Sequence, residues 1–257
     1  MSDLYKAFHE YFEIVIADTA SLKETVFRMR YQKLCIEMNV PGYEPSLYPD
    51  GQEKDNYDEH SSHILIQYRK TNEFIGTARL IMFDPESPKK LFPVEQYAKI
   101  DPKLFNVQRL SRRHTGEISR FMIINKFERR KAERRNYKTR EPGNNAVTTD
   151  RRSIKNLTLV LAAGIVRLCA KYNISYWLTI MDPALHRLLS YYGLALNPIG
   201  PEIQHYGLRR PYFGELPKIM EKMKQNHRSA WEVVTEQGKY SHFLAEEDCT
   251  EVARLSD

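Results

Sequence analysis

The feature that most constrains the fold is a strand, a long apolar helix and a second strand that follow one another. Residues 116–124 and 175–181 have strand character. Between them, residues 150–172 have helical spacing, with an apolar stretch at 157–166. Antiparallel neighbours can be joined by a tight turn, whereas parallel strands need a long crossover connection, usually a helix. We therefore expect these two strands to be parallel. The sequence therefore predicts an α/β fold with this helix packed across a sheet.

The first half of the chain predicts antiparallel strands instead. Residues 13–16 form a short strand, and residues 20–37 follow with helical spacing. Residues 63–68 and 74–83 are strands separated by the polar turn 70–72, which is typical of a β-hairpin. Combined with the crossover, this order predicts a mixed central sheet flanked by helices.

The C-terminal part predicts a short helix and an extension. Asp182 caps a helix over residues 183–191, with Pro183 at its first position. Two short strands are expected around Gly207. From Leu216 onward, a charged amphipathic helix and a polar tail follow. We therefore predict a main domain over residues 1–214 and a helical extension over 215–257.

Composition excludes several classes of protein. The chain has 257 residues and no apolar run long enough to cross a membrane. Its first residues lack the apolar core of a secretory signal. Cys35, Cys169 and Cys249 are far apart and odd in number, which indicates neither a disulfide framework nor a zinc site. We expect a cytoplasmic protein with at most peripheral membrane contact.

The positive charge is concentrated in one segment. The formal charge is +6, and residues 126–140 hold eight basic against two acidic residues, a balance of +6. The rest of the chain is therefore close to neutral. This basic insertion, within residues 125–152, is either a docking surface for an acidic partner or a solvated loop.

Several charged residues lie where apolar neighbours predict burial. Arg30 is three or four residues from Val26, Phe27 and Leu34, so it lies on the apolar face of its helix, and Arg28 faces solvent. A buried arginine needs a carboxylate partner. The segment 53–58 offers such partners in Glu53, Asp55 and Asp58.

Two predicted strands also carry charges. Strand alternation places Thr77, Arg79 and Ile81 on one face. In the later strand it places Glu117, Ser119 and Phe121 on one face and Arg120 on the other. These charges form either a buried ion-pair network or a functional site. For Arg79, a third alternative is an exposed position on an edge strand.

These residues form a pattern in sequence order. Arg30, the pair Asp55 and Asp58, the dipeptide Arg79-Leu80 and the motif Glu117-x-Ser119-Arg120-Phe121 resemble the signature of the acyl-homoserine-lactone (autoinducer) synthases. Residues 181–193 and 199–212 look instead like the acyltransferases associated with PEP-CTERM/exosortase systems, which are relatives of the N-acyl amino acid synthases. The resemblance covers about residues 10–214.

The resemblance implies a GNAT fold and an N-acyltransferase. A fatty acyl group would pass from an acyl-phosphopantetheine thioester, on an acyl carrier protein or coenzyme A, to the amine of an amino acid or similar small acceptor. No tightly bound cofactor or metal is implied. An acyl-homoserine-lactone synthase-like signal producer is the alternative, and a non-catalytic module that binds carriers or nucleic acid is another.

The resemblance also implies roles for residues. Glu117 resembles the family's base, and Asp55 and Asp58 either hold the acceptor's ammonium group or brace the loop above it. Arg79 or Arg120 either binds an acceptor carboxylate or pairs with the aspartates. The predicted catalytic group is Arg30, Asp55, Asp58, Arg79, Glu117, Ser119 and Arg120. The predicted donor-binding or carrier-binding group is Phe121, Met122, Arg129, Arg130, Arg134, Arg135, Arg151 and Arg152.

The segment after the Glu117 strand bears on the donor. Most GNAT enzymes that use coenzyme A have a glycine-rich loop there, whose N–H groups hold the pyrophosphate. Residues 125–152 have one glycine, Gly143, and are rich in Lys and Arg. We therefore favour docking of an acidic acyl carrier protein over a solvated insertion.

Other chemistries fit less well. His60 and His63 resemble a metal pair, but no other cluster completes a site. Nucleic-acid binding is disfavoured because the basic segment has few aromatic residues, Phe127 and Tyr137, and no recognition motif. We therefore expect no bound metal and no nucleic-acid partner.

Overall fold

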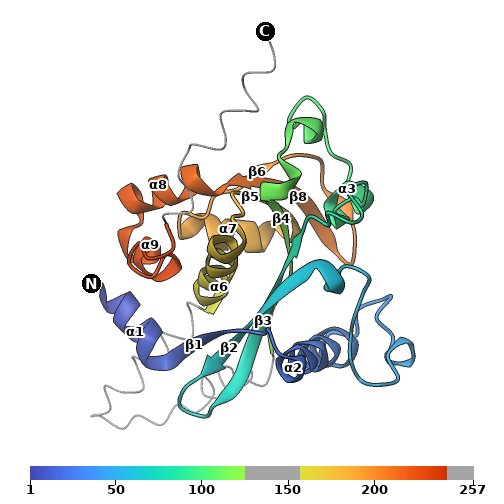
Figure 1. Cartoon of the computed structure of the whole chain (residues 1–257), viewed down its shortest axis with the longest axis horizontal. Helices are drawn as coiled ribbons and strands as arrows, with labels where there is room; N and C mark the ends of the chain where they lie inside the picture. The colour runs from blue at the N-terminus through green and yellow to red at the C-terminus, as the bar shows by residue number, and fades with distance from the viewer. Residues whose placement is uncertain (125–156, 242–257) are drawn as a thin grey trace.

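The computed structural model describes residues 1–124 and 157–241, which form a twisted sheet flanked by helices (Figure 1). The sheet has the order β1-β2-β3-β4-β5-β8-β6, and β7 pairs with β8. The strands are β1 (Phe12–Ile16), β2 (Ser61–Tyr68), β3 (Glu73–Met82), β4 (Thr115–Ile123), β5 (Tyr176–Met181), β6 (Asn197–Pro198), β7 (Ile203–Gln204) and β8 (Leu208–Glu215). All these pairs are antiparallel except β4 with β5, which is parallel. The predicted mixed sheet and its crossover are confirmed.

Helices cover both faces of the sheet. The crossover helix α6 (Leu157–Tyr172) packs against β1, β2 and β3 on one face. On the opposite face lies α2 (Ala20–Tyr31), which continues as the π-helix η1 (Gln32–Glu37) (Figure 1). The other α-helices within the described residues are α1 (Asp3–Tyr11), α3 (Pro93–Tyr97), α7 (Pro183–Tyr191), α8 (Leu216–Asn226) and α9 (Arg228–Val234).

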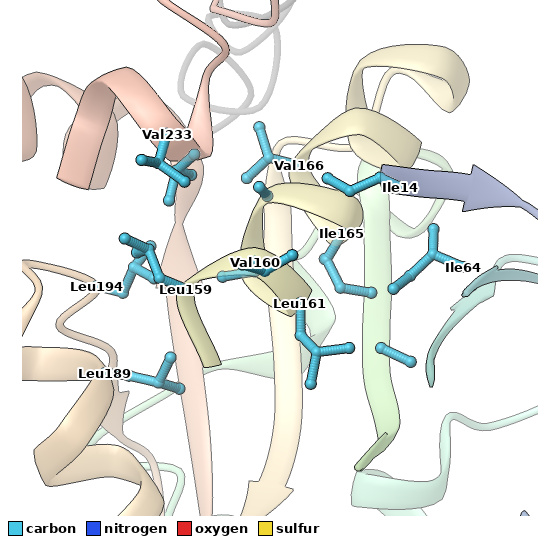
Figure 2. Close-up of a cluster of buried hydrophobic side chains, with 14 of the residues drawn as sticks. Ile14, Ile64, Leu159, Val160, Leu161, Ile165, Val166, Leu189, Leu194 and Val233 are labelled. Carbon is cyan, nitrogen blue, oxygen red and sulfur yellow. The ribbon is translucent and has the colours of Figure 1, made fainter. Parts of the chain in front are cut away.

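The main core lies between α6 and the sheet (Figure 2). Leu161 and Ile165 of α6 are buried in one cluster with Ile14 of β1 and Ile64 of β2. At Gly164, a methyl group would lie 2.9 Å from Ile64 Cδ1, so this glycine permits the close approach of α6 to β2. The other side of α6 packs against α9, which explains why the helix is apolar on nearly all sides.

The strands β4 and β5 diverge along their length. Their pairing joins Thr115–Glu117 to Tyr176–Leu178, and no further β4–β5 pair occurs among the described residues. Beyond that point β4 pairs with β3, and β5 pairs with β8. The sheet is therefore unpaired between β4 and β5 beyond Glu117 and Leu178, and we call this opening the gap.

The C-terminal helices share the main core. Leu216, Met220 and Met223 of α8 and Trp231 of α9 belong to the same buried cluster as α6. The backbone N–H of Ser2 donates to Glu232 Oε2 at 2.7 Å, and α1 contacts α9. The helix α1 was not predicted from the sequence. The division at residue 214 stays a prediction, and residues 242–257 lie outside the described part.

Most element boundaries agree with the prediction. The Asp182 side chain accepts a hydrogen bond from Ala184 N at 2.7 Å, which confirms the predicted cap of α7. The start of the crossover helix, predicted near residue 150, lies outside the described residues. None of the helices in the described ranges is long and apolar enough to pass through a membrane.

Candidate active site

Arg30 connects α2 to the loop before β2. Its side chain is fully buried, donates through Nε to Glu53 Oε2, and binds both oxygens of Asp58 at 2.6 and 3.0 Å. Arg28 lies on the outer face, where its side chain is 59% exposed and pairs with Glu24. The predicted helix phase is confirmed, and the buried arginine has the carboxylate partners that it needs.

Two strand arginines bind the same loop. Arg120 Nη2 lies 2.7 Å from Glu53 Oε1 and 3.0 Å from Asp55 Oδ2. Arg79 Nη1 lies 2.6 Å from Asp55 Oδ1 and 2.8 Å from Asp58 Oδ1. Each carboxylate therefore lies between two guanidinium groups.

Together the six side chains form a closed charge ring. Its order is Arg30, Glu53, Arg120, Asp55, Arg79, Asp58 and back to Arg30. Three positive and three negative groups alternate, so the charge ring is neutral. Ser119 Oγ accepts a further hydrogen bond from Arg79 Nε at 2.9 Å. From the sequence, Glu53 was predicted only as one possible partner of Arg30, and its bond to Arg120 was not predicted.

The prediction that Arg120 faces away from Ser119 was wrong. Thr77 pairs with Met122 and Arg79 with Ser119, so Arg120 and Phe121 together lie opposite Ala78 in a β-bulge. Arg120 has a left-handed backbone, with φ of 50°. This extra residue turns its guanidinium toward Arg79's partner, Asp55.

The same bulge reverses the faces of the next two residues. Met122, which pairs with Thr77, shares the face of Ser119 and Glu117. Phe121 packs instead against the core cluster around α6. The predicted placement of Phe121 beside Glu117 and Ser119 was therefore also wrong, because simple alternation fails at a bulge.

The charge ring controls the ionisation of its carboxyl groups. Burial alone would raise the pKa of Glu53, but the guanidinium groups of Arg120 and Arg30 outweigh burial and lower it to about 2. Burial opposes the ionised form of Asp58 as well, yet hydrogen bonds from Arg30 hold its pKa below the usual range. Both carboxylates are therefore ionised at neutral pH.

Glu117 lies outside the charge ring, and its pKa is raised, whereas those of Glu53 and Asp58 are lowered. Its buried side chain accepts a hydrogen bond from the N–H of Val94 in α3 at 2.8 Å. Burial raises the pKa of Glu117 to about 8, and the Val94 bond and the charge of Arg79 only partly offset this rise. Glu117 can therefore change its protonation state near neutral pH.

A cavity of about 480 Å³ connects these groups to an apolar chamber. Its polar end includes Asp55, Glu117, Ser119 and Arg120. The apolar end is built from β4, β5, α6, α7 and the segment after α7, and its lining includes Phe121, Met122, Ala162, Trp177, Met181, Leu185, Leu189, Leu194 and Leu196. Because the lining comes from both faces of the sheet, the cavity passes through the gap between β4 and β5.

Only part of the charge ring is open to this cavity. The side chains of Asp55 and Arg120 are 26% and 17% exposed, whereas those of Asp58 and Arg79 are 8% and 1% exposed. Arg30 and Glu53 are fully buried. A ligand in the cavity would therefore meet the Asp55–Arg120 pair, and the other four groups support that pair.

The aromatic lining of the polar end was missed by the sequence analysis. It consists of Tyr43, Tyr48, Tyr57, Tyr97, His205 and Tyr206. These residues come from loops, α3 and the segment between β7 and β8. They are scattered along the sequence without a motif, so only the folded chain brings them together.

The two histidines singled out in the sequence have separate neighbours. His60 Nε2 lies 3.0 Å from Asp84 Oδ2. His63 is buried edge-on against Phe27. Its burial, which is the larger cause, and the charge of Arg30 together lower the pKa of His63 to about 3. Across residues 1–124 and 157–241, no group of three or more metal-ligating side chains is present.

Of the predicted donor-binding residues, Phe121 and Met122 line the cavity. The other six, Arg129, Arg130, Arg134, Arg135, Arg151 and Arg152, lie outside the described residues. The basic segment 126–140 lies there too, so its role stays a prediction.

Comparison with known proteins shows the fold. The model of an acetyltransferase (GNAT) domain matches residues 29–137, a segment that contains all six members of the charge ring and Glu117. No curated protein matches the sequence.

Solved structures resemble the chain at low sequence identity. TofI, in a ternary complex with an inhibitor and MTA, is 13% identical, with 86% of this chain and 97% of that chain covered and a TM-score of 0.56. The CoA-dependent acyl-homoserine lactone synthase BjaI, with SAM and isopentyl-CoA, is 18% identical, with 88% of each chain covered and a TM-score of 0.50. The fold is therefore that of the GNAT acyltransferases.

Proposed function

We propose that this GNAT-fold chain is an N-acyltransferase that moves a fatty acyl group from a phosphopantetheine thioester to the amine of an amino acid or similar small acceptor. One observation carries the proposal. A single cavity joins the partly exposed Asp55–Arg120 pair and the titratable Glu117 to an apolar chamber, through the gap between β4 and β5. A charged head group and an alkyl chain fit the two ends of such a cavity.

The polar end suits a zwitterionic acceptor. Asp55 offers a carboxylate to an ammonium group, and Arg120 offers a guanidinium to a carboxylate. Arg79 is too deeply buried for this task and is held by Asp55, Asp58 and Ser119. Among the arginines considered in the sequence analysis, we therefore assign acceptor recognition to Arg120 and support of the pair to Arg79.

Glu117 is assigned the role of base. A pKa near 8 keeps a useful fraction ionised at neutral pH and makes that fraction strongly basic. The ionised carboxylate takes a proton from the acceptor's ammonium group, directly or through one water, and the neutral amine then attacks the thioester carbonyl. The C–N bond forms, the C–S bond breaks, and the departing thiolate takes up the proton that the nitrogen loses as the amide forms.

The gap between β4 and β5 is assigned to the thioester. Backbone groups that face the gap have no partner strand there among the described residues, so they can pair with the pantetheine arm. A backbone N–H at this edge would stabilise the negative charge that develops on the carbonyl oxygen. The acyl chain would extend past Trp177 into the chamber lined by Leu189 and Leu194.

The donor is proposed to be an acyl carrier protein that docks on the basic segment 126–140. The segment's charge balance of +6 supports this choice. Acyl-coenzyme A is the competing donor, since BjaI is described as CoA-dependent. The association with a PEP-CTERM/exosortase system stays a prediction based on sequence resemblance.

The test is thiol release from a defined donor with defined acceptors. Purified protein is incubated with acyl carrier protein or coenzyme A charged with acyl groups of several lengths, together with single amino acids. We expect free thiol and an N-acyl amino acid, identified by mass spectrometry. Release of thiol should rise with pH through about 8, and Glu117→Gln should slow it by about two to four orders of magnitude.

Other products would refute the proposal. An acyl-homoserine lactone formed with S-adenosylmethionine would identify the alternative signal synthase. Binding of acyl carrier protein without thiol release from any donor would indicate a non-catalytic module. Correct folding of Glu117→Gln with unchanged turnover would remove Glu117 from the mechanism.

A further inference from the structure

The tip of the β7–β8 hairpin forms part of the cavity wall. Ile203 pairs with Arg209 and Gln204 with Leu208, which leaves residues 205–207 as the tip. His205 N donates to Gly207 O at 2.9 Å and closes the turn. The side chains of His205 and Tyr206 both line the cavity.

Four aromatic rings from three separate segments meet at this tip. The ring centroids of Tyr206 and Tyr43 are 5.2 Å apart, and those of Tyr206 and His205 are 4.6 Å apart. His205 stacks on Tyr97 of α3, with centroids 5.2 Å apart. We call these four residues, Tyr43, Tyr97, His205 and Tyr206, the aromatic bridge.

The aromatic bridge lies beside the Asp55–Arg120 pair. The guanidinium carbon of Arg120 lies 5.3 Å from the centroid of the Tyr43 ring. All four rings line the same cavity as Asp55 and Arg120. A head group bound to that pair would therefore carry its remaining substituent toward these rings.

A glycine maintains the central contact of the bridge. Gly42 has a φ of 85°, and a methyl group at this position would lie 3.0 Å from Tyr206 Cε1. The absence of a side chain at Gly42 therefore lets the Tyr206 ring rest against the loop beside Tyr43. A larger residue would push the ring outward.

We propose that the aromatic bridge is a size filter for the acceptor, and this inference rests on the proposed function. The rings of the bridge contact one another beside the Asp55–Arg120 pair, so a small substituent on the amine-bearing carbon would leave these contacts in place. A bulky substituent must separate Tyr206 from Tyr43 and lose their ring contact. The acceptor class is therefore a compact α-amino acid, and Tyr206 determines the limit on its side chain.

The first experiment compares acceptors of different size. Values of kcat/KM are measured for alanine, leucine and phenylalanine with the wild type and with Tyr206→Ala. We expect Tyr206→Ala to raise the ratios of leucine and phenylalanine to alanine by about threefold to tenfold. Tyr191→Ala, which removes an exposed tyrosine of α7 outside the cavity lining, should keep the wild-type ratios.

The sign of the change separates exclusion from attraction. If the rings instead attract an aromatic acceptor, Tyr206→Ala will lower the ratio of phenylalanine to alanine, and the size filter is refuted. Unchanged ratios in Tyr206→Ala refute it as well.

The second experiment displaces the ring without removing it. Gly42→Ala should raise the same ratios, because the added methyl group pushes Tyr206 away from Tyr43. Gly51→Ala is the matched control: Gly51 also has a positive φ, of 66°, but its nearest contact would be Tyr31 at 3.9 Å. The control should match Gly42→Ala in backbone strain and keep the wild-type ratios. Equal ratios in both glycine variants would contradict the filter.

Binding measurements separate this inference from the proposed reaction. Dissociation constants for the same amino acids are measured by calorimetry without a donor. If neither the wild type nor any variant forms product, but Tyr206→Ala still improves the binding of leucine relative to alanine, the reaction is refuted and the filter stands. If products form but neither ratio responds to Tyr206→Ala, the filter fails and the reaction stands. Absence of any amino-acid binding or transfer refutes both.

Discussion

At the scale of single residues, Glu117 carries the most unusual ionisation among the described carboxyl groups. It is buried in the cavity wall, its N–H donor is Val94, and burial raises its pKa to about 8. The folded protein therefore retains a proton that the unfolded chain releases once pH exceeds the usual glutamate range. This proton links stability to pH in a direction opposite to that of a salt-bridged carboxylate.

We predict that the contribution of Glu117 to stability falls as pH rises from about 4.5 to about 8. In that window the folded state binds more protons than the unfolded state, so the free energy of unfolding decreases by up to about 1.4 kcal/mol per pH unit. Glu117→Gln removes this dependence. The melting temperature of the variant minus that of the wild type should therefore increase from pH 5 to pH 8.

The measurement is thermal unfolding across that range. Glu24→Gln, at a half-exposed position of α2, is the control and should follow the wild type. A constant difference in melting temperature between Glu117→Gln and the wild type would show that Glu117 titrates normally.

Arg30 and Arg28 form a second pair for comparison at this scale. Arg30→Ala would leave Glu53 and Asp58 buried without one of their guanidinium partners. We predict a loss of roughly 3–5 kcal/mol in the free energy of unfolding. Arg28→Ala removes only a surface pair with Glu24 and should cost less than about 1 kcal/mol.

Urea denaturation of both variants checks this prediction. A difference within error between the two variants would mean that the charge ring tolerates the loss of a member. In that case the adjacent guanidinium groups of Arg120 and Arg79 are enough to stabilise the three carboxylates.

At the scale of elements, the bulge in β4 decides how the site is built. It places Arg120 with the loop carboxylates and returns Phe121 to the core. A left-handed backbone is costly for a residue with a Cβ, and here bonds from Arg120 to Glu53 and Asp55 offset the cost.

At Arg120 we predict that a glycine variant is more stable than an alanine variant, the reverse of the usual order in a strand. Arg120→Gly and Arg120→Ala both remove the guanidinium, but glycine adopts the positive φ without strain. Arg120→Gly should therefore be more stable than Arg120→Ala by about 1 kcal/mol.

At Ser119, which has no positive φ, the usual strand order should hold, with the alanine variant more stable than the glycine variant. Chemical denaturation of the four proteins provides the test. The same order at both positions would argue against the left-handed bulge.

The basic segment 126–140 is the second element with a testable role. Reversing Arg129, Arg130, Arg134 and Arg135 to Glu should raise the apparent KM for an acyl carrier protein, because docking between opposite charges is lost. The kcat should change little, since these residues would act in docking. Wild-type KM for the carrier should also rise with salt, because exposed charges are screened.

Acyl-coenzyme A serves as the internal control for this variant. Its rate should respond weakly to the four reversals. If the variant keeps its KM for the carrier at low salt, or acyl-coenzyme A is the better donor, the docking role is refuted.

At the scale of the whole molecule, the N-terminal helix packs with the last helix of the described residues. The N-terminal helix α1 contacts α9, and α9 packs on α6. Arg167 of α6 donates to Glu236 and, at 2.8 Å, to the carbonyl of Ile14 in β1. These contacts connect the crossover helix, the first strand and the C-terminal segment.

We predict that the folded core depends on the C-terminal helices. Trp231→Ala removes a large side chain from the main core and should lower the free energy of unfolding by about 3–5 kcal/mol. Tyr191→Ala, at an exposed position of α7, should cost less than about 1 kcal/mol. Unfolding followed by circular dichroism measures both. A small loss in Trp231→Ala, with the sheet intact, would support residues 215–257 as a separate extension.

Local patterns were enough to predict much of the fold. The hairpin of β2 and β3, the α6 crossover and the Asp182 cap follow from periodicity and turn chemistry within short windows. The burial of Arg30 follows from helix phase relative to Val26, Phe27 and Leu34. These features depend on neighbours a few residues away, so the sequence by itself determined them.

Tertiary structure alone decided the details of the site. The bulge that turns Arg120 toward Glu53 depends on partners 65 and 67 residues away, and alternation along β4 predicts the wrong side. The aromatic bridge joins residues from positions 43 to 206 that share no motif. Such contacts arise only when distant segments pack together, because a period along the chain specifies which face a residue occupies but not what lies opposite it.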